Sequence, residues 1–168
     1  MAVPHPQMSS DSESDLIANP NHVEKPDENL PTIYITSFGH RRGPLVPTPD
    51  LSFNLRSLPC PPRDLTSTKT GLHKPIRSWI FSNPQVQSRF SEICQAITRG
   101  VQDAEANGVR ELHVGVFCEH GKHRSVCIVE ELKRQRFNEW IVVVQHRDVH
   151  LSRSKKARQD RSHADDDL

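Results

Sequence analysis

Apolar residues recur with two different periods along the 168-residue chain, and the order of these periods predicts its secondary structure. Four runs are apolar at alternate or successive positions, which is typical of strands. They lie at residues 33–37, 51–56, 112–117 and 140–144. Apolar residues spaced three to four positions apart predict helices at 84–106 and 124–137, and a shorter helix is expected at 75–81.

The long helix has clear signals at both ends. Asn83 is a favourable N-cap residue, and Pro84 suits the first helical position because the N–H there has no intrahelical partner. Asn107 and Gly108 then provide the stop signal. The predicted apolar face consists of Val86, Phe90, Ile93, Ile97 and Val101.

The second half of the chain predicts a βαβ unit, because strand, turn, helix and strand follow one another there. The last strand is a nearly continuous β-branched run, which is typical of a strand covered on both faces. The predicted fold is therefore α/β, a small three-layer domain with a mostly parallel sheet. We expect this domain to occupy residues 31–150.

Composition and charge separate this domain from the two ends of the chain. Hydrophobic residues make up only 34% of the chain, which suggests that part of it does not fold. Residues 1–30 hold one lysine against six acidic residues, and residues 151–168 pass from basic to acidic, so both predict disordered tails. Residues 31–150 hold 16 lysines and arginines against 11 acidic residues, a balance that suits anionic ligands.

Several classes of protein do not fit the sequence. No apolar run approaches the roughly 18 residues of a membrane span. The N-terminus has neither the basic nor the apolar region of a signal peptide. The cysteines form no CxxC pair, so reduced thiols are expected at Cys60, Cys94, Cys118 and Cys127. We therefore expect a cytoplasmic or nuclear protein with no membrane partner, no bound metal and no cofactor.

The segment after strand 112–117 concentrates the candidate chemistry. It consists of Cys118-Glu119-His120-Gly121-Lys122-His123-Arg124-Ser125. Backbone N–H groups at a helix start lack intrahelical partners and lie at the positive end of the dipole, so they attract anions. A glycine lets the backbone curl around an anion, and basic side chains add further donors. The segment therefore predicts a phosphate-binding loop.

Three alternatives apply to the same residues. A cysteine five residues before Arg-Ser has the spacing of cysteine-dependent phosphatases, in which Cys118 would be the nucleophile and Arg124 would hold the phosphoryl group. Asp148 is then the nearest candidate for the general acid. Cys118 could equally be a small apolar residue at the end of a buried strand. Metal binding by Cys118, His120 and His123 is the third alternative, but their spacing fits no standard zinc pattern.

Polar residues that follow the other strands are expected at the same edge of the sheet, because the carboxyl ends of parallel strands lie together. His146 and Arg147 follow the last strand. The segment 38–43, which includes Arg42, follows the first strand, and Arg56 lies at the end of the second. The alternative for His146 and Arg147 is a strand that simply ends in a polar tail.

These residues resemble the C-terminal domain of the bacterial RNase adaptor protein RapZ and its relatives. The resemblance covers residues 33–148 and consists of five blocks in order. They are Ser37-Phe38-Gly39 with Gly43; Asp50 with Phe53-Asn54-Leu55-Arg56-Ser57-Leu58-Pro59; Thr70-Gly71-Leu72 with Pro75; Gly121-Lys122-His123-Arg124-Ser125-Val126 after Cys118; and His146-Arg147. The resemblance implies an α/β domain that binds small regulatory RNA and a sugar phosphate, glucosamine-6-phosphate, self-associates and performs no catalysis. The P-loop motif of the family's other half, GxxxxGK[ST], does not occur in this chain, so nucleotide hydrolysis by that route is not expected.

The chain departs from the family pattern at three places. Glu119-His120 stands where the family has Thr-Gly, Asn54 stands for the Asp of Asp-Val-Arg, and Cys60 stands for the Asn of Asn-Pro. A carboxylate at position 119 would repel phosphate unless it points away or pairs with Arg124 or Lys122. We therefore expect an anion site with altered specificity.

The sequence thus predicts a binding module for a phosphorylated small molecule of the sugar-phosphate kind. The predicted ligand-binding residues are Arg42, Arg56, Cys118, His120, Gly121, Lys122, His123, Arg124, Ser125, His146 and Arg147. Binding of structured RNA, through the basic body and the Lys155-Lys156-Ala157-Arg158 stretch, is a weaker expectation because aromatic residues make up only 5% of the chain. A homo-oligomer is expected from the resemblance alone.

Overall fold

The computed structural model describes residues 30–151, so the tails predicted at 1–30 and 151–168 lie almost wholly outside the described residues. The elements in chain order are β1 (Thr32–Gly39), the 3-10 helix η1 (His40–Arg42), β2 (Leu51–Asn54), α1 (Arg63–Thr66), α2 (Lys74–Phe81), α3 (Pro84–Ala106), β3 (Glu111–Cys118), α4 (Arg124–Leu132) and β4 (Ile141–His146). In this part of the chain, no helix has both the length and the apolar character of a membrane span.

The four strands form one sheet in the order β2-β3-β1-β4, and every neighbouring pair is parallel. This confirms the predicted α/β class. Gly39 at the end of β1 pairs with Cys118 of β3, and Ser37 pairs with His146 of β4. The strand ends that carry the candidate residues therefore meet at one edge of the sheet, which we call the carboxyl edge.

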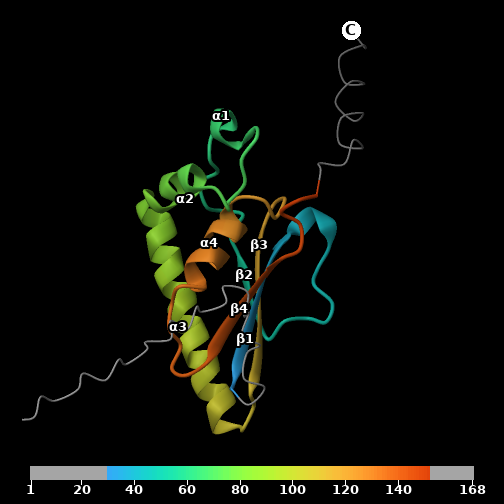
Figure 1. Cartoon of the computed structure of the whole chain (residues 1–168), viewed down its shortest axis with the longest axis vertical. Helices are drawn as coiled ribbons and strands as arrows, with labels where there is room; N and C mark the ends of the chain where they lie inside the picture. Colours follow the sequence, from blue (N-terminus) through green and yellow to red (C-terminus); the bar gives the residue numbers. More distant parts are fainter. Residues whose placement is uncertain (1–29, 152–168) are drawn as a thin grey trace, which may run out of the picture.

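The longer helices cover one face of the sheet (Figure 1). Ile97 of α3 and Ile128 of α4 are fully buried, and they belong to one core with Ile33 of β1 and Val114 of β3. These strand residues alternate with outward-facing ones, which is why one face of each strand is apolar. Both long helices thus share a single core.

The opposite face carries a loop where the sequence predicted a third layer. Near Gly115, the segment 43–50 crosses this face, and an added Cβ on Gly115 would lie 2.9 Å from Cγ of Pro49. Farther along the face, Tyr34 and His113 are exposed and stack with ring centroids 5.1 Å apart. β4 is accordingly only half-buried along most of its length. A continuous apolar run shows that a strand is apolar on both faces, but not whether a helix or a loop covers the second one.

The directions of the connections explain this asymmetry. The connections from β2 to β3 and from β3 to β4 both step toward the β4 side, and their helices lie on one face. The connection from β1 to β2 steps the other way. Crossovers between parallel strands are almost always right-handed, so the reversed step must pass over the opposite face. The neighbours β1 and β3 therefore send the chain to opposite faces, which creates a topological switch point between their carboxyl ends.

Helix α3 confirms the signals read from the sequence. The side chain of Asn83 accepts a hydrogen bond from the Gln85 N–H at 2.9 Å, as an N-cap residue does. The helix ends at Ala106, and Gly108 follows with a φ of +67°. Four of the five predicted apolar-face residues are buried, and Phe90 packs at the margin of the core.

Helix α4 is shorter than predicted, because it ends at Leu132 rather than near residue 137. The chain reverses at Asn138, whose φ is +52°, and the reversal brings the Ile141 N–H within 2.8 Å of the Pro31 carbonyl oxygen. Strand β4 begins at this point and needs the reversal in order to run parallel to β1. Asparagine tolerates a positive φ, so the turn carries no glycine that would mark it in the sequence.

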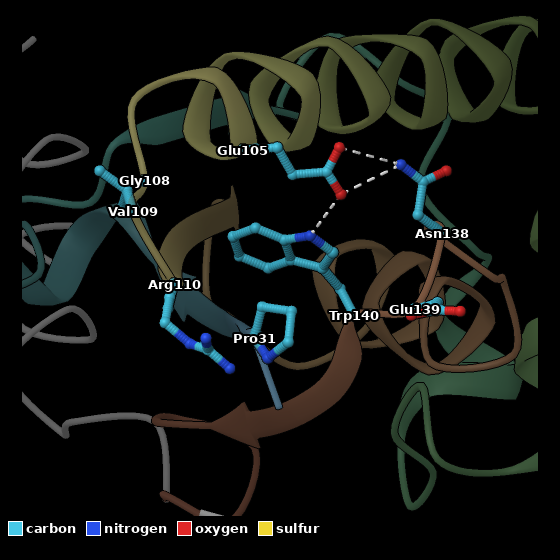
Figure 2. A pocket seen from close by; sticks show the side chains of 8 residues that line it. All are labelled: Pro31, Glu105, Gly108, Val109, Arg110, Asn138, Glu139 and Trp140. Atoms are coloured by element: carbon cyan, nitrogen blue, oxygen red, sulfur yellow. Dashed lines mark hydrogen bonds between the residues drawn. The ribbon is translucent and has the colours of Figure 1, made fainter. Parts of the chain in front are cut away.

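A cavity of about 520 Å³ lies at the amino edge, the end of the sheet away from the candidate residues (Figure 2). The carboxylate of Glu105 lines it and accepts hydrogen bonds from Trp140 Nε1 at 2.9 Å and from Asn138 Nδ2 at 3.2 Å. Figure 2 shows the indole ring lying between Glu105 and Pro31. These bonds tie the end of α3 to the turn before β4, which gives this region a structural role.

Candidate anion-binding site

Two glycines hold the carboxyl edge together through direct backbone contact. Gly39 ends β1, and Gly121 lies in the loop after β3 with a φ of +70°. An added Cβ on Gly121 would lie 2.6 Å from Gly39 N, and one on Gly39 would lie 2.6 Å from the carbonyl carbon of His120. No side chain fits between these two backbone segments. The loop 119–123 is therefore pressed against the end of β1.

Asp148 and Arg147 fix the same contact from the β4 side. Asp148 is 2% exposed, and its Oδ2 accepts hydrogen bonds from the Gly39 N–H at 2.7 Å and from Arg147 Nη2 at 2.9 Å. Arg147 also donates to the carbonyl oxygens of Gly43 at 3.0 Å and Pro44 at 2.8 Å. Both residues thus support the loop after β1, and Asp148 is an acceptor here rather than an acid facing a ligand.

Cys118, Ser125 and His123 lie at the base of the loop. Cys118 is 3% exposed, and its Sγ lies 3.2 Å from Oγ of Ser125. His123 is at the N-cap position of α4, with Nε2 3.1 Å from the carbonyl oxygen of Lys69. These contacts fix the first turn of α4, whose N–H groups face the loop. Among residues 30–151, no three His, Cys, Asp or Glu side chains form a group suited to a metal ion.

Arg124 supports the turn that follows β2. This strand ends at Asn54, two residues earlier than predicted, and Asn54 Oδ1 accepts a hydrogen bond from the Arg56 N–H at 2.9 Å. Arg124 is 8% exposed. Its Nη1 donates to the carbonyl oxygens of Leu55, Arg56 and Leu58 at 3.2, 2.8 and 2.8 Å. Arg124 therefore acts on the site by holding Arg56 at the carboxyl edge.

Glu119 lies on the outer side of the loop and bridges two arginines. Its Oε1 accepts a hydrogen bond from Arg41 Nε at 2.7 Å, and its Oε2 accepts one from Arg56 Nε at 2.8 Å. We call this group the Glu119 bridge. The hydrogen bonds from Arg41 and Arg56 lower the pKa of Glu119 to about 2. Glu119 is thus paired with arginines from the segments after β1 and β2 rather than with Arg124 or Lys122.

His146 is engaged on the helix-covered side of the sheet. Its Nδ1 lies 2.7 Å from Oγ of Ser37, and its Nε2 lies 3.0 Å from Oε1 of Glu130 in α4. Glu130 in turn lies 3.7 Å from an Nη atom of Arg77 in α2. This chain of contacts connects β1, β4, α4 and α2, and it is separate from the Glu119 bridge.

The other predicted residues lie near the outer surface of the loop. Arg42 of η1 is exposed, and His120 and Lys122 are half-buried. The carbonyl oxygen of Lys122 accepts a hydrogen bond from the Gly71 N–H at 2.8 Å, which ties the loop to the segment before α2. With the arginines of the Glu119 bridge, these side chains give the carboxyl edge a positive character that one carboxylate offsets in part.

Comparison with known proteins agrees with this architecture. The sequence model described as the RapZ C-terminal domain matches residues 31–150. The chain belongs to this family. A "nucleotide-binding protein" of Acinetobacter baumannii is 33% identical over 120 residues, which cover 70% of this chain and 41% of that protein.

Two further relatives with the name "nucleotide-binding protein" match the chain with similar identity and coverage. The one from Thermotoga petrophila is 32% identical over 122 residues, covering 70% of this chain and 42% of its own length. The one from Deinococcus radiodurans is 30% identical over 109 residues, covering 64% of this chain and 38% of its own length. The chain therefore spans about two fifths of the length of the curated relatives it matches.

In this RapZ C-terminal domain, the sequence blocks that carried the resemblance meet at the carboxyl edge. Gly71, from the third block, packs against the start of α4, and an added Cβ there would lie 2.5 Å from the carbonyl oxygen of His123. Ser37 and His146, from the first and last blocks, bond to each other. Several motif residues are thus needed to build the edge, whatever the edge binds.

Arg41 is a candidate site residue that the sequence prediction missed, although the segment 38–43 was placed at this edge. The register between β1 and β3 would have pointed to Arg41. Gly39 pairs with Cys118, so the residues just beyond β1 and β3 in the RapZ C-terminal domain are neighbours. A basic residue at 40–42 is therefore within reach of an acidic residue at 119, and Arg41 forms this pair.

Proposed function

We propose that this domain binds a phosphorylated small molecule of the sugar-phosphate class at the carboxyl edge between β1 and β3. The observation that carries the proposal is the topological switch point. In open parallel sheets, ligands bind where neighbouring strands send their connections to opposite faces. In this domain, η1 follows β1 and the loop 119–123 follows β3 at this point.

The chemistry of the segments around this switch point suits a phosphate group. The nine-residue helix α4 begins there, and the N–H groups of a first helical turn are donors aligned with the positive end of the dipole. Lys122, Arg42 and Arg56 belong to the segments that follow β3, β1 and β2, and their partly or fully exposed side chains can form charge-assisted hydrogen bonds to phosphate oxygens. Gly121, with its positive φ, lets the loop turn tightly where it packs against the end of β1, just before the start of α4.

The names of the relatives support a phosphate-bearing ligand in general terms. They are called nucleotide-binding proteins, and a nucleotide carries phosphate. The matched region is about two fifths of each relative, so the name describes a longer protein. It therefore does not distinguish a nucleotide from a sugar phosphate as the ligand of this domain.

Calorimetric titration with glucosamine-6-phosphate, glucose-6-phosphate and unphosphorylated glucose tests the proposal. We expect both phosphate esters to bind and glucose not to bind. Lys122→Ala should weaken binding of the esters about tenfold, because it removes a charge-assisted contact. Lys133→Ala is the matched control, because Lys133 is exposed just beyond the other end of α4 and should leave the affinity unchanged. Arg124→Ala is a poor choice, because Arg124 holds the turn at 55–58.

Two results would overturn the proposal. One is that neither phosphate ester binds, and the other is that glucose binds as tightly as its 6-phosphate. A loss of affinity of equal size in Lys122→Ala and Lys133→Ala would show that general positive charge, rather than the loop, attracts the ligand.

The proposal does not extend to RNA binding or to phosphatase activity. The basic stretch at residues 155–158, which was expected to contact RNA, lies outside the described residues. Arg124 and Asp148, which the phosphatase alternative requires, are engaged in hydrogen bonds that support the fold. Neither alternative is favoured by a specific contact in residues 30–151.

A further inference from the structure

Glu119 presents a carboxylate to the arginines that a phosphate at the carboxyl edge would use. Its two oxygens accept hydrogen bonds from the Nε atoms of Arg41 and Arg56, at 2.7 and 2.8 Å. These arginines come from η1 and from the turn after β2, and they converge on this one carboxylate. Two guanidinium groups from separate segments around one anion form an arrangement suited to ligand recognition. In this protein, the carboxylate of Glu119 takes the place of that anion.

Because the Glu119 bridge is exposed to water, another anion can replace Glu119 on its two arginines. The side chains of Arg41 and Arg56 are 59% and 41% exposed, and that of Glu119 is 27% exposed. Ion pairs in contact with water contribute little to stability, because water screens their attraction and long side chains lose freedom when they pair. An incoming anion can therefore take the place of Glu119 without disturbing the fold.

Phosphate and the Glu119 carboxylate are both negatively charged, so phosphate binding to these arginines requires that Glu119 leave them. A phosphate monoester carries a charge of about −1.5 to −2 at neutral pH, so an ionised carboxylate on the same arginines repels it. Glu119 is held ionised by the two arginines and does not become neutral near pH 7. Phosphate can use Arg41 and Arg56 fully only when the Glu119 side chain swings out toward solvent.

We infer that Glu119 is an internal competitor: it occupies Arg41 and Arg56 and lowers the affinity of the carboxyl edge for phosphate monoesters. This inference rests on the proposed function and adds to it a residue that sets the affinity of the site.

Titration with inorganic phosphate at about pH 8, where phosphate is dianionic, tests the inference on the full chain. We expect Glu119→Gln to bind phosphate about tenfold more tightly than the unmodified protein, because two weak exposed pairs no longer compete. Glu92→Gln is the matched control. It changes the net charge by the same amount and breaks an exposed pair with Arg89 on α3, so its affinity should not change.

A second measurement follows the bridge itself. In the unmodified protein, the Nε–Hε resonances of Arg41 and Arg56 and the side-chain carboxyl carbon of Glu119 should shift together as phosphate is added. Arginine resonances that move while the carboxyl carbon stays fixed would show that phosphate binds beside Glu119 without displacing it, which contradicts the inference. Thermal unfolding of both variants at the wild-type temperature would confirm that the fold is intact.

The titration separates the inference from the proposed function. If the unmodified protein and Glu119→Gln bind phosphate equally, the proposed function stands and the inference is overturned. If Glu119→Gln binds more weakly, Glu119 assists the ligand and the inference is again overturned. If neither protein binds phosphate or a sugar phosphate, the proposed function itself fails.

Discussion

Two groups of arginine and carboxylate side chains lie at the carboxyl edge, and they differ mainly in burial. In the first, Asp148 is 2% exposed and connects Arg147 to the backbone of Gly39. In the second, Glu119 joins Arg41 and Arg56 where all three side chains contact water. The same chemical pairing therefore serves two purposes: the buried group fixes the backbone, and the exposed group remains free to exchange partners.

The backbone contact beneath both groups should give the largest effect. Gly121→Ala adds a Cβ only 2.6 Å from Gly39 N, at a residue whose φ is +70°. We expect a loss of about 4 kcal/mol in the free energy of unfolding, from backbone strain and steric overlap together. Urea denaturation followed by circular dichroism measures it.

Gly108→Ala separates these two causes. Gly108 has a similar φ of +67°, but an added Cβ there has no neighbour within 4 Å. This variant should lose only about 1 kcal/mol, the cost of the left-handed conformation alone. Equal losses in the two variants would show that the contact between residues 39 and 121 does not constrain the edge.

Removing the carboxylate from each group tests the comparison directly. Asp148→Ala leaves the Arg147 guanidinium and the Gly39 N–H without their buried acceptor, so we expect a loss of about 3 kcal/mol in the free energy of unfolding. Glu119→Ala should change the unfolding midpoint only slightly, because its arginines are solvated. Similar losses in both variants would contradict the distinction between supporting and exchangeable groups.

The sequence was sufficient for the fold because its signals are local and periodic. The N-cap at Asn83, the apolar face of α3 and the alternation in β3 each depend on residues close together in the chain. The parallel sheet followed from the order of these elements. The end of α4 was missed because the chain leaves the helix after Leu132 through tighter turns, in which Arg134 and Gln135 bond to carbonyl oxygens three residues back, without a glycine or proline to mark them.

The roles within the site were harder to predict, because they depend on contacts distant in sequence. The loop was located correctly at the carboxyl edge, beside the end of β1. Its sequence does not show that carbonyl oxygens at 55–58 engage Arg124, or that Asp148 bonds to the Gly39 N–H. A basic residue in a loop motif has the same sequence signal whether it binds a ligand or supports a turn.

A third carboxylate, Glu105 at the amino edge, extends the comparison to neutral donors. It accepts hydrogen bonds from Trp140 Nε1 and Asn138 Nδ2 (Figure 2). Glu105→Ala leaves the nearly buried indole N–H without an acceptor, and we expect a loss of about 1 kcal/mol in urea denaturation. Glu105→Gln keeps an amide oxygen as acceptor and should stay close to the unmodified protein. A Glu105→Gln loss as large as that of Glu105→Ala would mean that charge, not hydrogen bonding, matters at this edge.

The smallest effect concerns the protonation of Glu119. Its pKa in the folded protein is about 2, below the ordinary value of 4.5, chiefly because of the hydrogen bond from Arg41 and then that from Arg56. Because water screens the exposed bridge, its ionised form adds only a slight stabilisation of the fold, which is present above about pH 4.5 and is lost as the pH falls toward 2. Carboxyl-carbon NMR titration should show the low pKa in the unmodified protein and a rise toward 4.5 in Arg41→Ala, with a smaller rise in Arg56→Ala.

Arg89→Ala, which removes an exposed arginine from α3, should leave the pKa of Glu119 unchanged. A Glu119 that titrates near 4.5 in the unmodified protein would mean that the bridge does not persist in solution, and the arginines would then be open to ligand without competition.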